Sequence, residues 1–134
     1  MIALYFGIIA AVVAVDLVTK FNINGILNYG IAWGFGSNLP WLWIVIVVIS
    51  FLLVAVLSGW FVYNEKVNWT EAAGLGLFVG GILGNAIDRF ISKGPVHDFI
   101  NFGIFTNNIA DIAITIGAIV FVVGLYLGEK RASR

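Results

Sequence analysis

The sequence predicts an all-α membrane protein of four transmembrane helices, with a small extended or β-like element in the loops at one end. The first observation is composition: 61% of the 134 residues are apolar, only 10% are charged, and the mean hydropathy is +1.05. Soluble domains are about 45–50% apolar and about 25% charged. A chain this short cannot bury such an excess in one core, so the excess must face lipid.

The second observation is a set of four apolar stretches, at residues 2–19, 41–63, 72–91 and 109–128. A hydrocarbon core about 30 Å thick needs about 20 helical residues, so each stretch is long enough to span it. No basic segment precedes the first stretch, and we expect it to be a permanent span rather than a cleaved signal peptide. No linker divides the chain, so residues 1–134 should form a single integral-membrane domain.

The third observation concerns the sides of the membrane. Four spans place both termini on one side, and the basic C-terminal tail favours the cytoplasm for that side. The loop that contains Glu65 and Lys66 is then cytoplasmic as well. This topology places four basic residues on the cytoplasmic side (Lys66, Lys130, Arg131, Arg134) and three on the outer side (Lys20, Arg89, Lys93).

Composition also excludes several classes of function. The formal net charge is zero, so no basic field is available to bind nucleic acid. The chain has no cysteine and one histidine, which excludes thiolate chemistry and a metal site of several histidines.

Polar residues gather at the predicted outer ends of the spans, and the opposite ends should carry no comparable group. They are Asp16 and Lys20 at the end of the first span, Asn85, Asp88 and Arg89 at the end of the third, Asp98 in a loop and Asp111 at the start of the fourth. A charge near the centre of a membrane helix costs about 2.5–3.5 kcal/mol on insertion scales, so persistent charges indicate function. Glycines at 76, 80 and 84 line one stripe of the third span, where we expect close helix packing, with Asn85 and Asp88 facing inward.

Two of the acids, Asp98 and Asp111, lie thirteen residues apart at the end of the third loop. Two carboxylates held close together share a proton, so one can activate water while the other protonates a carbonyl, as in aspartic proteases. Simpler roles exist, because Asp111 suits a helix start and Asp98 suits a solvated loop. Spacing alone leaves pairings with Asp88 or Asp16 open. His97 suggests a serine triad, but Ser92 lacks a nucleophile motif, so we interpret His97 as a peripheral loop residue or a pH-sensitive neighbour.

Four motifs follow one another along the chain: DLVTK at 16–20, NYGIAWG at 28–34, GGILGNAIDR at 80–89 followed by GPVHDFI at 94–100, and NIAD at 108–111. In these blocks the chain resembles the bacterial lipoprotein signal peptidases, or type II signal peptidases. The resemblance implies that Asp98 and Asp111 are the catalytic dyad. It also implies substrate-binding or supporting roles for Asp16, Lys20, Asn28, Asn85, Asp88, Arg89 and Asn108.

Members of that family are aspartyl endopeptidases that cut a prolipoprotein just before its diacylglyceryl-modified cysteine, without a metal or cofactor. The resemblance therefore implies a multi-pass protein of the bacterial inner (cytoplasmic) membrane, with its active site at the outer face. Its partners would be the lipidated prolipoprotein and membrane lipid, and we expect a monomer. The chain departs from the family pattern at Trp33, His97 and Asn107, and the stretch between the two acids is short.

The main alternative is a small four-helix transporter or channel that uses the acids as a proton or cation relay. A conduction path needs polar residues at several depths, yet the second span offers only Ser50 and Ser58. A structural partner in a larger complex is a third interpretation, and it leaves the polar cluster unexplained. The sequence therefore favours a peptidase.

Overall fold

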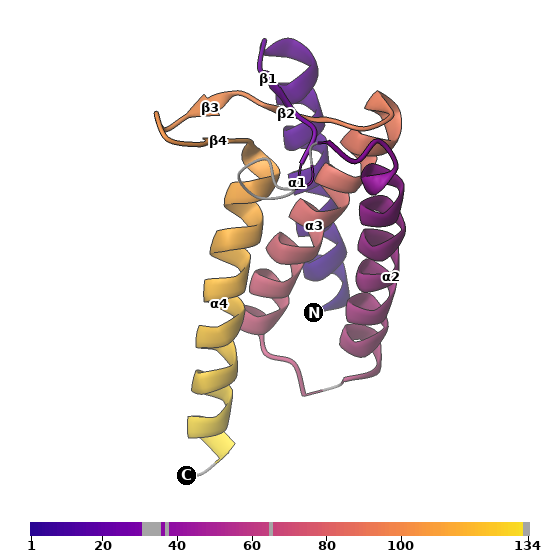
Figure 1. Cartoon of the computed structure of the whole chain (residues 1–134). Coiled ribbons are helices and arrows are strands. Elements are labelled where there is room, and N and C mark those ends of the chain that lie inside the picture. The colour runs from indigo at the N-terminus through magenta and orange to yellow at the C-terminus, as the bar shows by residue number, and fades with distance from the viewer. Residues whose placement is uncertain (31–35, 37, 65, 133–134) are drawn as a thin grey trace.

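The computed structural model describes residues 1–30, 36, 38–64 and 66–132. Within them, four long helices run side by side: α1 (Ile2–Asn22), α2 (Leu42–Tyr63), α3 (Trp69–Ser92) and α4 (Ile109–Ala132) (Figure 1). Each has a segment long and apolar enough to cross a membrane, so the predicted four-helix fold is confirmed. Trp33, Gly34, Glu65 and Arg134 lie outside the described residues, as do the side chains of Lys130 and Arg131.

Three helix ends differ from the prediction by three or four residues, and one of them is the end of α4, which lies at Ala132 rather than at residue 128. α1 continues to Asn22, so Phe21 and Asn22 are helical rather than part of an extended loop. α3 begins at Trp69, three residues before the predicted start, because Asn68 caps it. The Asn68 side chain accepts hydrogen bonds from two backbone N–H groups of the first turn, and Glu71 accepts one in return from the Asn68 backbone, which is a capping box.

α3 is the central helix, and it packs against α1, α2 and α4. The predicted glycine stripe forms the contact with α1: a Cβ atom built on Gly80 would lie 2.9 Å from Cβ of Val12. The contact with α4 is equally close, because a Cβ on Gly74 or on Gly117 would overlap the backbone of the facing helix. Small residues on both surfaces therefore allow the helices to approach backbone to backbone.

The outer surfaces of the helices are apolar. On α2, Leu52 is 61% exposed and Val56 is 66% exposed. The buried core is small and lies between α1, α2 and α3, where Tyr5 stacks on Phe61 with ring centroids 4.0 Å apart. Exposed leucine and valine over a whole helix are expected where the surrounding solvent is lipid rather than water.

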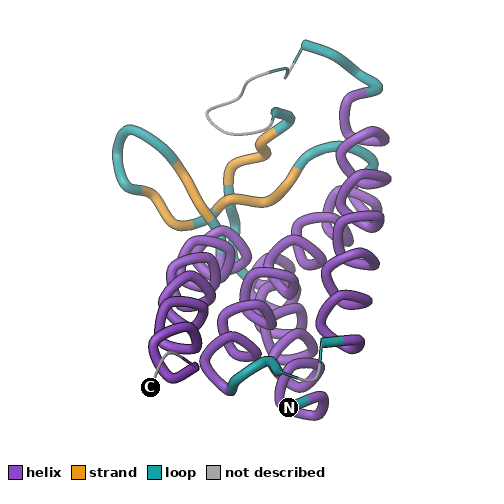
Figure 2. The backbone as a smooth tube through the Cα atoms, turned by 90° about the horizontal axis from the view of Figure 1, so that it is seen from below, coloured by secondary structure: helices purple, strands orange, loops and turns teal. Residues whose placement is uncertain are grey.

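Two short sheets cover one end of the bundle (Figure 2). β1 (Ile26–Asn28) pairs antiparallel with β2 (Val96–Asp98), and β3 (Ile100–Asn101) forms a hairpin with β4 (Thr106–Asn107). The predicted β-like element is thus present. Both termini lie at the opposite end of the bundle (Figure 1).

The termini end of the bundle holds a buried polar group, so the expectation that this end carries none was wrong. Glu71 is only 7% exposed. Its carboxylate accepts a hydrogen bond of 2.6 Å from the side-chain amide of Asn68, which also donates to the Gly124 carbonyl at 3.1 Å. These bonds serve the cap of α3 and fasten α3 to α4, so the role of Glu71 is structural.

Candidate active site

Asp98 is the last residue of β2, and only 2% of its surface is exposed. The pairing of β1 with β2 brings Asn28 next to it, although the two residues are 70 positions apart in sequence. Asn28 Nδ2 donates to Asp98 Oδ2 at 3.1 Å, and Asn108 Nδ2 donates to Asp98 Oδ1 at 2.7 Å. Thr106 Oγ1 lies 3.5 Å from the same Oδ2 atom. The carboxyl group is therefore fixed by two side-chain amides, one from the end of β1 and one from the residue that precedes α4.

Asp111 lies in the first turn of α4 and forms a second capping box with Asn108. Asn108 Oδ1 accepts a hydrogen bond from the Asp111 backbone at 3.0 Å, and Asp111 Oδ2 accepts one from the Asn108 backbone at 3.2 Å. Asn85 Nδ2 donates to the other carboxylate oxygen, Oδ1, at 2.8 Å. The simple role of Asp111 at a helix start is thus real, and the same carboxylate also faces the site.

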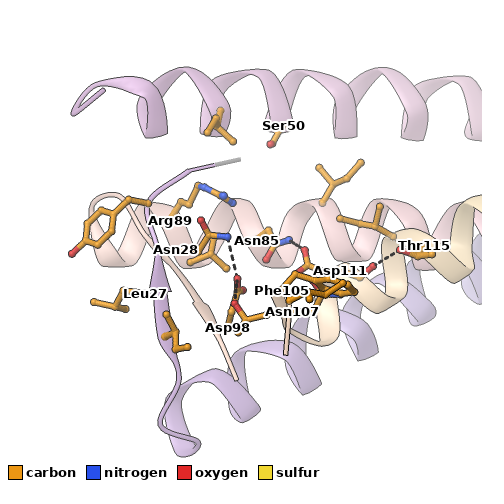
Figure 3. Close-up of a pocket in the computed structure, with 18 residues that line it drawn as sticks. Leu27, Asn28, Ser50, Asn85, Arg89, Asp98, Phe105, Asn107, Asp111 and Thr115 are labelled. Carbon is orange, nitrogen blue, oxygen red and sulfur yellow. Dashed lines mark hydrogen bonds between the residues drawn. The ribbon is translucent and has the colours of Figure 1, made fainter. Parts of the chain in front are cut away.

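Asn108 connects the two acids. Its side-chain amide donates to Asp98, and its backbone N–H donates to Asp111. The amide of Asn85 lies on the other side, with its oxygen 3.1 Å from Asn108 Nδ2. Both carboxyl groups line one cavity of about 910 Å³ together with Asn28, Asn85 and Arg89 (Figure 3).

The other candidate acids, Asp16 and Asp88, are completely buried and do not line this cavity. They flank Lys20, whose Nζ atom lies 2.7 Å from Asp16 Oδ2 and 3.4 Å from Asp88 Oδ2. The same ammonium group donates to Asn85 Oδ1 at 2.9 Å. Asp16 also accepts a hydrogen bond from the Ala110 backbone at 2.9 Å. This buried cluster ties α1, α3 and the start of α4 together and contacts the cavity wall at Asn85.

His97 is a strand residue that fastens β2 to α3, so its interpretation as a peripheral loop residue was wrong, whereas a pH-sensitive role beside Asp88 stays a prediction. Its backbone N–H donates to Asp88 Oδ2 at 2.9 Å, and its Nδ1 atom lies 2.9 Å from Asp88 Oδ1. Ser92 Oγ also donates to Asp88, at 3.1 Å, and not to His97. No serine nucleophile therefore accompanies this histidine among the described residues.

Arg89 reaches from α3 toward the loop after β1. Its Nη2 atom donates to the Gly30 carbonyl at 2.9 Å, whereas its buried Nε atom has no partner among the described residues. Three serine and threonine residues that line the cavity were not predicted as site residues: Ser50 on α2, Thr106 on β4 and Thr115 on α4. Serine and threonine are common in helices and loops, so the sequence alone gave no signal for them.

Burial raises the pKa of the Asp98 carboxyl above its ordinary value, and the nearby charge of Asp111 acts in the same direction. The hydrogen bonds from Asn28 and Asn108 partly oppose this rise. A buried acid beside a second carboxylate is the arrangement that keeps one proton between two acids. Among the described residues, no group of three or more His, Asp or Glu side chains could hold a metal ion.

Comparison with known proteins identifies the family of the chain. A family model described as signal peptidase (SPase) II matches residues 5–127, which is most of the chain. The chain belongs to the signal peptidase II family. It is therefore a protease, and its four apolar helices make it a multi-pass bacterial membrane protein. The transporter and scaffold alternatives are not favoured by this match.

Relatives of this signal peptidase II family member are similar over most of their length. A lipoprotein signal peptidase of Lactobacillus gasseri is 37% identical, over 85% of this chain and 82% of the relative. One of Geobacillus thermodenitrificans is 33% identical, over 92% and 89%. A solved structure of a bacterial membrane enzyme matches with a TM-score of 0.82 and 26% identity, over 98% of this chain and 92% of the other.

Proposed function

We propose that this protein is an aspartyl endopeptidase that removes signal peptides from diacylglyceryl-modified prolipoproteins and cleaves just before the lipidated cysteine. Membership of the signal peptidase II family and the names of the relatives support the substrate. One observation carries the aspartyl mechanism: Asp98 and Asp111 line the same cavity and are hydrogen-bonded to the same residue, Asn108.

In the proposed reaction, Asp98 holds the shared proton and Asp111 is the carboxylate. This assignment follows from the burial of Asp98 and from the place of Asp111 at a helix N-terminus, where negative charge is stabilised. Asp111 takes a proton from a water molecule whose oxygen attacks the scissile carbonyl carbon, while Asp98 protonates the carbonyl oxygen. The C–N bond then breaks, the amine leaves with the proton held by Asp111, and Asp98 recovers its own.

The remaining predicted residues divide into two groups in this proposal. Asn28, Asn85 and Asn108 orient the two carboxyl groups through hydrogen bonds, and Arg89 lines the cavity and holds the loop after β1. The second group positions the first through the contact of Lys20 with Asn85 and consists of Asp16, Lys20 and Asp88. Both carboxyl groups and the cavity belong to one chain, so a monomer suffices for the reaction.

We also propose that the end of the bundle with the strands faces the outside of the cytoplasmic membrane, because the basic C-terminal tail lies at the opposite end and favours the cytoplasm. Tryptophan prefers the membrane interfaces. Trp41 precedes α2 at the site end and is 55% exposed, while Trp69 begins α3 at the other end and is 60% exposed. This pattern supports a bilayer that covers the helices between these levels and leaves the dyad near the outer interface, where water arrives.

The topology predicts which positions an impermeant thiol reagent can reach. The chain has no cysteine, so single cysteines can be introduced without background. We expect Ile104→Cys, at the exposed tip of the β3–β4 hairpin, to react from outside intact cells, because Ile104 is 88% exposed. Lys66→Cys should react only after the membrane is permeabilised. Reaction of Lys66→Cys from outside would reverse the topology and the proposed outer site.

The function is tested by the cleavage of paired precursors in one membrane mimetic. The lipidated prolipoprotein should be cut at the bond before its cysteine, and the same precursor without lipid should be cut at least about tenfold more slowly. The lipid holds the cysteine at interfacial depth, level with the dyad, so its loss misplaces the scissile bond. The transfer of the acyl chains from bilayer to protein adds little binding free energy, because both surroundings are apolar.

Equal rates on the two precursors would contradict a lipoprotein-specific peptidase and leave a general intramembrane protease. The absence of any cleavage would overturn the proposal altogether. A precursor whose lipidated cysteine is moved deeper along the signal helix serves as a control, because it keeps the lipid and shifts the depth of the bond.

A further inference from the structure

The cavity has a deep end that the proposed chemistry does not use. It extends from the two carboxyl groups toward the membrane centre, between the walls formed by α2, α3 and α4. Ile82 and Ile114 make this end apolar, and two hydroxyl groups interrupt it: Ser50 on α2 and Thr115 on α4. Ser50 is eight residues along α2 from Leu42, about 12 Å into the span at 1.5 Å per residue.

The two serines of α2 differ in their surroundings. Ser58 Oγ lies 2.9 Å from the hydroxyl of Tyr5, so its polar group is satisfied inside the bundle. Ser50 points from α2 into the cavity, and its hydroxyl has no hydrogen-bond partner among the described residues (Figure 3). A hydroxyl at membrane depth without a hydrogen-bond partner costs free energy. Its place in a cavity wall therefore indicates that a bound ligand supplies the partner.

The proposed substrate has groups that need such a partner. Its apolar signal segment crosses the membrane as a helix, because only then are its backbone groups satisfied in lipid. The scissile bond must be extended to reach the dyad, so the helix ends just below it. The last four carbonyl groups of any helix lack partners within that helix, and here they lie in an apolar layer.

We propose that Ser50 is a substrate-binding residue that donates a hydrogen bond to a main-chain carbonyl in the last turn of the signal helix. The inference rests on the proposed function and adds a binding contact to it. Thr115 does not compete for this role, because its Oγ1 atom already donates to the Asp111 carbonyl at 2.9 Å. A main-chain contact suits an enzyme whose clients differ in side chains, because every signal helix ends in free carbonyls.

The test uses purified full-length enzyme in liposomes and a lipidated precursor with its complete signal helix. We expect Ser50→Ala to raise KM about threefold to tenfold, the loss of one neutral hydrogen bond, with kcat within about twofold of wild type. Ser50→Thr keeps the hydroxyl and should restore KM. Ser58→Ala is the matched control on the same helix: it loses a structural bond and should leave KM unchanged.

A second measurement identifies the carbonyl. Precursors with a single ester in place of one amide have a weaker carbonyl acceptor at that position. At one position in the last helical turn, the ester should raise KM for the wild type and have little effect on Ser50→Ala, so the two changes are not additive. Wild-type KM for Ser50→Ala, with no coupled ester position, would overturn the contact while cleavage itself still supports the function. Failure of the wild type to cleave would overturn both.

Discussion

Replacement of Asp98 or of Asp111 by asparagine is expected to lower kcat at least about 10³-fold, with the protein still folded. Asparagine keeps the size of the side chain but cannot accept a proton from water or deliver one to the carbonyl. In the proposed mechanism the two carboxyl groups share one proton and act in the same step, so the double variant should be no slower than either single variant. Cleavage of the lipidated precursor and thermal unfolding in detergent measure the two properties.

Two controls decide whether the loss belongs to the dyad. Glu129→Gln makes the same carboxyl-to-amide change at an exposed position near the C-terminus and should have wild-type kcat. Asp88→Asn changes a buried acid beside β2 and should be milder than either dyad variant. An inactive Asp88→Asn enzyme together with an active Asp98→Asn enzyme would show that the catalytic pair has been assigned to the wrong residues.

The raised pKa of Asp98 predicts how kcat of the proposed reaction depends on pH. The shared proton must be present for the carbonyl to be protonated, so kcat should fall as the pH rises and that proton is lost. Because burial raises the pKa of Asp98, this alkaline fall lies above the ordinary aspartate value of about 3.9. The contribution of Asp98 to the free energy of unfolding depends on pH in the same direction as kcat. It is complete at low pH and decreases as the pH rises through the folded-state pKa.

The sequence predicted the helices well because lipid imposes a simple rule on them. An apolar run of about 20 residues must be helical in a bilayer, so α2 and α4 follow from composition alone. The predicted helix ends were less accurate than the spans, since the cap by Asn68 and the extension of α1 to Asn22 depend on local hydrogen bonds. A capping residue lies outside the apolar run, so hydropathy does not detect it.

The site was predicted as a set of polar residues at one end, but its pairing came from the resemblance to a family. Spacing left Asp16 and Asp88 open because the pairing depends on contacts distant in sequence. Asn28 reaches Asp98 only through the pairing of β1 with β2. The exposure of a carboxyl to a cavity, which separates Asp98 and Asp111 from the other acids, is a property of packing.

The face of α2 that meets the cavity was hidden for a related reason. α2 is apolar on every side, so its sequence shows no polar stripe to indicate which face is covered by protein. Ser50 and Ser58 therefore look equivalent in the sequence, and only the packing separates them. The buried lysine is the opposite case, because a charge in an apolar segment is conspicuous but its partners are not.

Replacement of Lys20 by methionine is expected to destabilise the protein strongly, by about 3–5 kcal/mol. The side chains of Lys20, Asp16 and Asp88 are all fully buried, and the ammonium group is within 4 Å of both carboxylates. Methionine fills similar space but leaves two buried carboxylates without their cation. We expect the unfolding midpoint in detergent to fall by about 10 °C or more.

Restoration of the charge balance should recover part of the loss. In the Lys20→Met background, Asp16→Asn removes one uncompensated charge, so the double variant should unfold at a higher temperature than Lys20→Met alone, which is the reverse of additive damage. Lys66→Met changes an exposed lysine and should leave the midpoint unchanged. The cation also holds Asn85, whose amide donates to Asp111, so Lys20→Met should lower kcat in the fraction that remains folded. A Lys20→Met protein as stable and as active as the wild type would show that this cluster does not position the dyad.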